Sequence, residues 1–499
     1  MSSRLSPLLL LLSFFFSGCA GLYFQKAPVV EAPPPLGELS RLPQREDWFG
    51  VIFNGEKIGL THYRIEERNA PAGTFEIFSE ALLRFKVLGL GKEVVLKESG
   101  TVAADMTLID FVSDMTLDGK KIILSGKVRE KELIVWEETE RRKEEKIFPL
   151  SQPLFPGLAI NFYPLLHGLQ VGRNFRYLIY SPQSRSLQEV SQEVVGYESS
   201  KLFPGEAFKV KTSMAGLSTT SWINARGETL LEMAIMGALL TVKEDEPLAK
   251  QFLYEKSLAK SDLLLDYSLV KADKMIPNPR ALKSLQVELE GFPDAGLFVC
   301  TDWQEVQIKK QEKGWSGRYT LKASSPLSER ALLLPIAGPQ MKAFLRASAA
   351  IQSMSPEITK QAEDILQGEG NALLAVKKIV HWMKREVKSS LQESFSALDV
   401  LHSKQGECQA HSFLYTALAR AAGIPTKIVS GLVFVEGLGF LYHSWTESYV
   451  GEWVAVDPTF GQVGADATHI KLIEGERFED LSPLIHVIGR LKARVIGYE

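Results

Sequence analysis

The sequence predicts an α+β chain of several domains, with antiparallel strands in its N-terminal half and a mixture of helices and strands in its C-terminal part. Three observations lead to this prediction. The chain has 499 residues, which is more than one hydrophobic core usually supports. Strand-like runs with hairpin turns extend over residues 47–274. After Pro335, in contrast, apolar residues recur at helical spacing.

The first residues predict export. One arginine and the apolar run 8–16 precede Cys19, which is typical of a signal peptide that spans residues 1–18. The segment Phe16-Ser17-Gly18-Cys19 resembles the bacterial lipoprotein box, which implies a lipidated Cys19 and stable membrane anchoring. Ala20 is similar to the outer-membrane sorting pattern, so the expected location is the bacterial cell envelope, at the periplasmic face of the outer membrane. A plain secretory signal or an uncleaved anchor is the alternative.

Two segments follow the lipidation signal. Residues 19–46 are rich in proline, with Pro33-Pro34-Pro35 at their centre, and predict an extended tether. Residues 47–274 predict one large antiparallel β domain, either undivided or made of two related halves. Asn54-Gly55 and Asp118-Gly119 indicate hairpin turns there, because these dipeptides tolerate positive φ. The domain shows no carboxylate pair, phosphate loop or metal spacing, so the sequence does not specify its ligand or an envelope protein partner.

A smaller strand-rich stretch, residues 275–335, predicts a β module of its own or a bridge to the next domain. Trp303 and Trp315 lie in it, and they are more typical of a core than of a ligand platform. Cys300 ends the apolar run 297–300 and is expected to be a buried strand residue.

The last predicted domain, residues 336–499, begins with helices. Apolar residues recur every three or four positions in 358–366 and in 372–387, as they do on one face of a helix. Ser396 and Asp399 then form a start similar to a capping box for a further short helix. The residues with catalytic chemistry come directly after it.

Cys408 lies at the N-terminal tip of a predicted helix that continues through residues 412–422 and stops at Gly423. Backbone N–H groups at a helix start lack partners and carry partial positive charge. This field is expected to stabilise the thiolate and to lower the pKa of Cys408. The same donors, including the N–H of the cysteine itself, could hold a developing oxyanion. Glu407 works against thiolate formation unless its side chain points to solvent.

His443 and Asp457 belong to a predicted β hairpin. The expected strands of this region are residues 427–435, 440–450 and 453–457. A two-residue loop at Gly451-Glu452 would place the two side chains on opposite faces. A three-residue loop, Val450–Glu452, would pair Trp445 with Asp457 and make His443 its diagonal neighbour, within side-chain reach. The odd loop, or an equivalent bulge, is predicted.

Five motifs of this region match one family pattern: Gly406-Glu407-Cys408, Ala419-Arg420-Ala421-Ala422-Gly423-Ile424-Pro425, His443-Ser444-Trp445, Asp457-Pro458-Thr459 and Asp466-Ala467-Thr468-His469-Ile470. Through them, residues 397–472 resemble the bacterial transglutaminase-like superfamily, whose fold is similar to that of papain. The resemblance implies an acyl transfer in which Cys408 is the nucleophile, His443 the general base and Asp457 the acid that orients the imidazole.

Three neighbours of the triad are secondary candidates. Gln405 could donate to an oxyanion, by analogy with papain-like enzymes. His411 shares a helical face with Cys408 and fits packing or support of the site. Trp445 fits shielding of the site from water or packing of the hairpin. A zinc site made of Cys408, His411 and His443 is an alternative that lacks a fourth ligand, and no cofactor is expected.

Two functional hypotheses follow. A net charge of −3 is close to neutral for this length, so nucleic acid is not an expected partner. The first hypothesis is an envelope-anchored cysteine hydrolase or acyltransferase that acts on peptide or protein amides. A peptidase or amidase is favoured over a cross-linking enzyme, because water is the abundant acyl acceptor. The second hypothesis is a non-catalytic envelope binding or assembly protein whose β-rich region carries the function.

Overall fold

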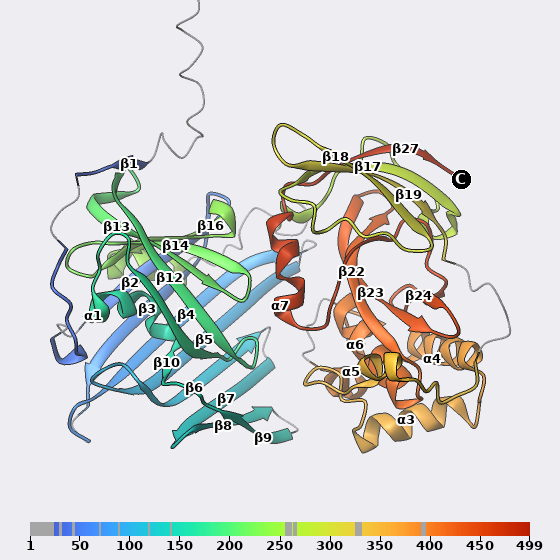
Figure 1. Cartoon of the computed structure of the whole chain (residues 1–499), viewed down its shortest axis with the longest axis horizontal. Helices are drawn as coiled ribbons and strands as arrows, with labels where there is room; N and C mark the ends of the chain where they lie inside the picture. Colours follow the sequence, from blue (N-terminus) through green and yellow to red (C-terminus); the bar gives the residue numbers. More distant parts are fainter. Residues whose placement is uncertain are drawn as a thin grey trace, which may run out of the picture. The chain divides into compact units, whose positions relative to one another are not determined.

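The structure is a computed structural model of the chain. It describes residues 24–28, 32–41, 45–68, 71–87, 90–117, 120–139, 142–254, 262, 267–324, 332–390 and 396–499. The chain forms two compact units, Met1–Phe85 with Gly91–Lys260, and Lys86–Leu90 with Ser261–Glu499. The first unit is built almost entirely of strands, and the second combines helices with strands, which confirms the predicted α+β class (Figure 1). Within the described ranges, no helix has the length and apolar character needed to cross a membrane.

One large sheet makes up most of the first unit. Its strands follow the order β10-β11-β12-β13-β14-β15-β16-β2-β3-β4-β5-β6-β7-β8-β9, and β1 pairs with β12. Strand β16 pairs with β2, so the two strand-rich regions of the sequence share one sheet. The strands are β1 Phe24–Lys26, β2 Arg45–Phe53, β3 Glu56–Glu67, β4 Thr74–Val87, β5 Leu90–Ala103, β6 Leu108–Leu117, β7 Lys120–Arg129, β8 Glu132–Thr139, β9 Arg142–Pro149, β10 Leu154–Pro156, β11 Asn174–Ser181, β12 Ser186–Ser200, β13 Phe203–Met214, β14 Leu217–Ile223, β15 Thr229–Ala234 and β16 Leu239–Glu244. Helix α2, Glu246–Tyr254, follows the last of them.

The turn between β2 and β3 forms as predicted, with Asn54 at φ 49° and Gly55 at φ 84°. The predicted turn at Asp118-Gly119 lies outside the described residues. Between β10 and β11 the chain forms a 3-10 helix, Gly157–Phe162, that leads into α1, Tyr163–His167. Two cavities of about 190 and 380 Å³ share this 3-10 helix as part of their lining.

Part of the predicted tether is structured instead. Strand β1 adds to the sheet beside β12, and the ring of Phe24 stacks on Trp222 with centroids 4.5 Å apart. Leu39 begins a 3-10 helix, Leu39–Arg41, and its side chain is buried. The prediction of an extended tether over residues 19–46 is therefore wrong for these segments, because their apolar side chains join the core. Cys19 and the signal segment lie outside the described residues.

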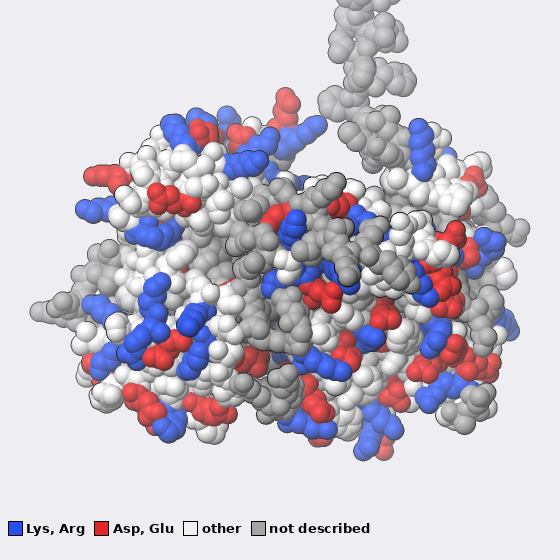
Figure 2. Space-filling model, turned by 180° about the vertical axis from the view of Figure 1, so that it is seen from behind, with Lys and Arg blue, Asp and Glu red and all other residues white. Residues whose placement is uncertain are grey.

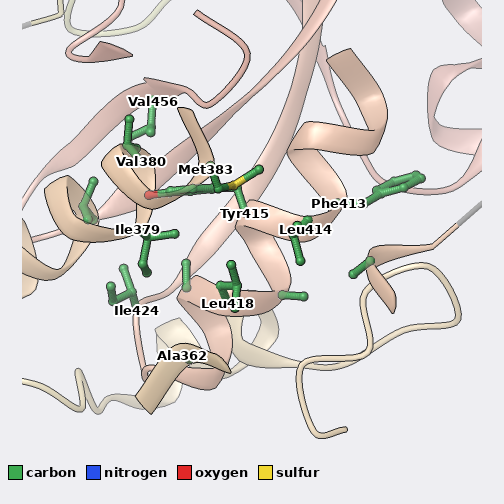
Figure 3. Packing of buried hydrophobic residues seen from close by; sticks show 14 of the residues in the cluster. Ala362, Ile379, Val380, Met383, Phe413, Leu414, Tyr415, Leu418, Ile424 and Val456 are labelled. Carbon is green, nitrogen blue, oxygen red and sulfur yellow. The ribbon is translucent and has the colours of Figure 1, made fainter. Parts of the chain in front are cut away.

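Four helices open the C-terminal part of the second unit. They are α3 Pro356–Leu366, α4 Ala372–Glu386, α5 Ala397–Ser403 and α6 Cys408–Ala421. The first two match the predicted periodic segments, and α5 begins as predicted, with the Ser396 side chain accepting a hydrogen bond from the Asp399 backbone N–H. Figure 3 shows Ile379 and Met383 of α4 packed with Leu414 and Leu418 of α6 in one buried apolar cluster. This cluster holds α6, whose first residue is Cys408, against its neighbours.

A five-stranded sheet in the order β25-β24-β23-β22-β26 follows the helices. Its strands are β22 Thr426–Val435, β23 Gly439–Tyr449, β24 Trp453–Asp457, β25 Gln462–Val463 and β26 Ile470–Glu474. Val454 and Val456 belong to the same buried cluster as the helices, whereas Phe434 and Phe440 pack with a second sheet. Both faces of the sheet are thus covered, and this explains why polar side chains on its strands are buried as well.

The second sheet of this unit corrects a predicted domain boundary. It has the order β18-β19-β17-β27, from β17 Ser284–Phe292, β18 Gln304–Lys310, β19 Trp315–Lys322 and β27 Lys492–Tyr498. Residues 275–335 are therefore not a separate module, because the last strand of the chain completes their sheet. Cys300 lies outside these strands and is exposed, so the prediction of a buried strand cysteine is wrong. Only Leu297 of its apolar run is buried.

Two short strands and one helix complete the unit. Strands β20, Lys388–Ser389, and β21, Gln405–Gly406, pair in parallel just before α6. Helix α7, Phe478–Leu481, follows β26. Acidic and basic side chains are intermingled over the face of the molecule shown in Figure 2.

Candidate active site

Cys408 is the first residue of α6, as the sequence predicts. The preceding residue, Glu407, is the N-cap and has an extended backbone, with φ −85° and ψ −173°. Its carboxylate accepts hydrogen bonds from the backbone N–H groups of Gln409 at 2.6 Å and of Ala410 at 2.9 Å. These bonds satisfy donors that a helix start otherwise leaves open. The sequence thus places the thiol at the tip of a helix whose body is buried.

The electrostatics of the Cys408 thiol differ from the prediction. Burial raises the pKa of the thiol, and the Glu407 carboxylate, whose Oε2 lies 3.3 Å from Sγ, raises it further. A hydrogen bond from the backbone N–H of Ser444 to the sulfur lowers the pKa, but by less than burial and Glu407 raise it. The prediction that the helix start lowers the pKa of Cys408 is wrong, because a carboxylate occupies two of the N–H groups whose field was expected to act on the sulfur.

The β23–β24 hairpin has the predicted odd loop. Tyr449 pairs with Trp453, which leaves Val450–Glu452 as a three-residue connection. His443 and Asp457 consequently project on the same face of the hairpin. The Nε2 atom of His443 lies 2.8 Å from Oδ2 of Asp457. The predicted juxtaposition of this histidine with this carboxylate is confirmed.

Asp457 is fully buried and accepts four hydrogen bonds. Its Oδ1 accepts from the backbone N–H groups of Thr459 at 2.8 Å and of Phe460 at 2.9 Å. Its Oδ2 accepts from Nε2 of His443 and, at 3.0 Å, from Nε2 of His469. Burial alone would raise the pKa of Asp457, but the charges and hydrogen bonds of the two histidines outweigh burial and hold this pKa well below its ordinary value. The group is therefore an ionised carboxylate in a fixed orientation.

This carboxylate also fixes the proton on His443. An ionised carboxylate only accepts hydrogen bonds, so the proton of the neutral imidazole is on Nε2, and Nδ1 is free of that proton. The Cys408 thiol lies beside the same strand, because it receives a hydrogen bond from the N–H of Ser444, the residue after His443. The negative charge of Asp457 is near enough to raise the pKa of the thiol as well. The thiol and the His443–Asp457 pair thus lie beside the same stretch of β23.

His469 belongs to the same site, although the sequence reasoning gave it no role. It is buried between Asp457 and Asp466, and its Nδ1 lies 3.4 Å from Oδ1 of Asp466. Burial would lower the pKa of His469, but its hydrogen bonds to the two carboxylates raise it to about 9. The stretch Asp466–Ile470 was a signal, since it carries part of the family resemblance. Its contact with Asp457 depends on the path of the loop before β26, which residue types alone do not specify.

The secondary candidates on the α6 side of the site take different positions. Gln405 is half-buried in β21, directly before the N-cap of α6, and its donation to an oxyanion stays a prediction. His411 is buried, and its Nδ1 forms a hydrogen bond of 2.9 Å with the backbone carbonyl oxygen of Glu407. His411 therefore supports the start of the helix, which agrees with the predicted packing role.

Aromatic rings enclose the two histidines. Trp445 is fully buried, and its ring lies against His443, with centroids 6.2 Å apart, and against His469, with centroids 5.2 Å apart. Phe460 stacks on His443 at 5.1 Å. Trp445 thus packs the hairpin as predicted, and these rings exclude water around the hydrogen bonds of Asp457, which strengthens their electrostatic effect.

The residues with metal-ligand spacing, among those that the structure describes, are His443, Asp457 and His469, with ligand atoms within 4.8 Å of one another. This set differs from the predicted zinc alternative of Cys408, His411 and His443. Both Nε2 atoms lie at hydrogen-bond distance from a single oxygen of Asp457, at 2.8 and 3.0 Å. The arrangement fits a proton-transfer site.

Comparisons with known proteins place this site in a family. The family model of the Transglutaminase-like superfamily matches residues 359–458, a range that contains Cys408, His443 and Asp457. The C-terminal part of the chain is therefore a transglutaminase-like domain, as the resemblance implied.

Two curated relatives share only a part of their length with the chain. An uncharacterized protein of Mycobacterium leprae (strain TN) is 32% identical over 99 residues, which cover 18% of this chain and 34% of that protein. The kyphoscoliosis peptidase of Mus musculus is 24% identical over 144 residues, which cover 26% of this chain and 22% of the mouse protein. A solved structure of a proposed cysteine protease from Cytophaga hutchinsonii is 17% identical, with a TM-score of 0.30, and the match covers 44% of this chain and 86% of that one.

Proposed function

We propose that the transglutaminase-like domain is a thiol acyl-transfer enzyme that cleaves or transfers amide bonds of peptides or proteins. Cys408 is its nucleophile, His443 its general base and acid, and Asp457 the group that orients His443. One arrangement carries the proposal. The hairpin register sets His443 against a buried, ionised Asp457, and the backbone N–H of Ser444, the next residue of the same strand, donates a hydrogen bond to the Cys408 sulfur. The relative from mouse is named a peptidase, which supports a peptide amide as the substrate class.

The proposed mechanism assigns each proton transfer to an atom. Nδ1 of His443 takes the thiol proton as Sγ of Cys408 bonds to the amide carbonyl carbon. The protonated ring then gives that proton to the leaving amine, the C–N bond breaks, and a thioester remains on Cys408. Water attacks the thioester with His443 as base, which releases the carboxylic acid and restores the thiol. An amine in place of water gives a transferred acyl group.

Fewer backbone N–H donors are available to stabilise the oxyanion than the sequence predicts. Glu407 already holds the N–H groups of Gln409 and Ala410. The backbone N–H of Cys408 is not one of the donors that Glu407 takes, and we assign it to the developing oxyanion. Gln405, two residues before the helix cap, is the side chain that we propose as the second donor.

We place this activity in the bacterial cell envelope. The proposal rests on the lipoprotein-like segment that ends at Cys19, and a lipid on this cysteine would hold the enzyme at the periplasmic face of the outer membrane. Peptides or proteins of the envelope are then the substrates within reach. We propose that the β-rich first unit binds a substrate or an envelope protein partner.

A digestion in H₂¹⁸O tests the proposed function. Pools of synthetic peptides are incubated with the purified full chain and with its Cys408→Ala variant, and the products are analysed by mass spectrometry. Hydrolysis by the triad adds ¹⁸O to new C-termini only in the wild-type sample. Transfer to amines would give Cys408-dependent adducts without ¹⁸O. This result would support an acyltransferase and would contradict the preference for hydrolysis. Identical product patterns from both chains would remove the enzyme hypothesis in favour of a binding protein.

Replacing Glu407 with glutamine should make Cys408 more acidic. The carboxylate beside Sγ disfavours the thiolate, so its neutralisation should lower the pH of half-maximal Cys408 alkylation by about one unit. Labelling by chloroacetamide, followed by peptide mass spectrometry between pH 5 and 10, measures this midpoint. The exposed Cys300 in the same chain is the internal reference. The matched variant Glu363→Gln, on the exposed side of α3, should leave the midpoint unchanged, and an unchanged midpoint in Glu407→Gln as well would contradict the assigned role of this carboxylate.

A further inference from the structure

We propose that His469 is a positioning residue of the triad: it shares Asp457 with His443 and thereby holds the carboxylate, and through it the His443 ring, in the orientation in which Nδ1 can accept the Cys408 proton. The inference rests on the proposed function, because it assigns His469 a role in the same reaction. His469 itself touches neither the thiol nor, in this proposal, the substrate.

The first observation is a shared acceptor. His443 and His469 both donate from Nε2 to the same oxygen, Oδ2 of Asp457, at 2.8 and 3.0 Å. The other oxygen of Asp457 is held by two backbone N–H groups. The carboxylate therefore cannot rotate without breaking several bonds at once, and its orientation sets that of the His443 ring.

The second observation is that His469 is anchored from its far side. Asp466 faces its Nδ1, and Oδ1 of Asp466 also accepts from the backbone N–H of Thr468 at 2.9 Å and from its hydroxyl at 2.6 Å. Arg280, in the 3-10 helix Pro279–Ala281, lies with Nη1 2.9 Å from Oδ2 of Asp466. The guanidinium of Arg280 also rests on the ring of Phe460, 4.3 Å from its centroid. Two acids and one arginine thus fix the position of the second histidine.

Charged groups of opposite sign alternate along this set of residues. Asp457 and Asp466 are anions, while His469 and Arg280 are cations. The pKa of His469, raised to about 9 by its two carboxylates, keeps it charged at neutral pH. His469 is therefore held by an ion pair on each side, and its ring centroid lies 6.0 Å from that of His443.

The state of the nucleophile makes the position of His443 important. Burial and then Glu407 raise the pKa of Cys408, so the sulfur rests as a thiol. The charged groups that face the reacting pair are Asp457 at the end of β24, His469 before β26, and Glu407 at the start of α6. The thiol proton must therefore be taken up during the reaction, which requires that the His443 ring is held in place.

Two variants of His469 separate its charge from its hydrogen bond. His469→Gln retains a side-chain N–H donor but removes the charge, and His469→Leu removes both. The pH dependence of Cys408 alkylation by chloroacetamide is measured between pH 4.5 and 10 in the full chain, relative to Cys300. His402→Gln is the matched control, because His402 lies on α5 and is ion-paired with Glu357 of α3. The thermal unfolding of each chain is measured as well, to check that the variants are folded.

His469→Gln retains a donor to Asp457, so its Cys408 rate at pH 8 should stay within about threefold of the wild type. His469→Leu should lower the rate at pH 8 by about 10- to 100-fold, as is typical when a supporting hydrogen bond is lost. His402→Gln should match the wild type.

A His469→Leu rate at pH 8 equal to that of the wild type, or an equal loss in His469→Gln and His469→Leu, would overturn the positioning role of this hydrogen bond. The His443→Ala variant separates this inference from the proposed function. If His443→Ala leaves the alkylation profile unchanged, the triad itself is refuted. If His443→Ala changes the profile and the His469 variants do not, only the inference about His469 fails.

Discussion

Replacement of Cys408 by alanine should abolish amide cleavage, with a fall in kcat/KM on the order of 10⁶ once a cleaved peptide has been identified. The reason is that the thioester step needs a thiol, and among the described residues the other free cysteine, Cys300, is exposed and lies outside the site. Loss of the nucleophile of a triad typically costs about as much as loss of the whole triad, because its members act as a unit. Initial rates on one cleaved peptide, compared between the two full-length chains, give the ratio.

The control for this variant is Cys300→Ala. Cys300 is exposed and belongs to none of the site elements, so its replacement should leave kcat/KM unchanged. A Cys408→Ala chain that retains activity close to the wild type would show that the hydrolysis arises elsewhere or comes from a contaminant. Parallel loss in both cysteine variants would indicate damage to the fold and would call for the more conservative Cys408→Ser.

Replacement of Asp457 by asparagine should have the second largest effect. Both carboxylate oxygens accept two hydrogen bonds each, whereas an asparagine has one oxygen and an NH₂ group that only donates. Its NH₂ group must then face either two backbone N–H groups or two histidines. We expect kcat to fall about 10⁴-fold, because the imidazole loses its orientation and tautomer. We also expect a loss of about 3–5 kcal/mol in the free energy of unfolding, because His469 loses one of its two buried counter-charges.

Activity assays and urea unfolding of the full chain measure these two effects. Asp364→Asn is the matched control, because it removes a carboxylate from an exposed ion pair on α3, where little stability is at stake. The pH dependence of stability gives a second test, because its direction can be predicted. Asp457 has a depressed pKa, so its contribution to stability is present at neutral pH and is lost as the pH falls through the acidic range. The Asp457→Asn chain should therefore lose less stability on acidification than the wild type, and an equal loss in both chains would contradict the account.

Local patterns predicted much of the second unit, because they depend on neighbours in sequence. The spacing of apolar residues predicted α3, α4 and α6. The odd number of residues in the hairpin loop predicted that His443 and Asp457 lie on the same face, since one residue more or less in the loop moves a side chain to the other face of a strand. These features follow from fixed helical and strand periods. They do not require knowledge of how distant segments pack.

Features set by long-range packing were not predictable in the same way. The partnership of His469 with Asp457 depends on how a loop returns to the sheet, and the pairing of β27 with β17 joins strands about 200 residues apart. The pKa of Cys408 was predicted in the wrong direction because the sequence could not show that Glu407 folds back onto its own helix start. Helix-end electrostatics depend on which group occupies the free N–H donors.

Alkylation of Cys408 by chloroacetamide in the wild type, His443→Ala, Asp457→Ala and the double variant tests the central claim most directly. Rates at pH 7, referred to Cys300 in the same chain, show whether the imidazole acts on the sulfur under the control of the carboxylate. We predict that each single variant changes the Cys408 rate by a similar factor and that the double variant is no different from His443→Ala. Equal Cys408 rates in all four chains would show that the histidine and the acid do not act on this thiol.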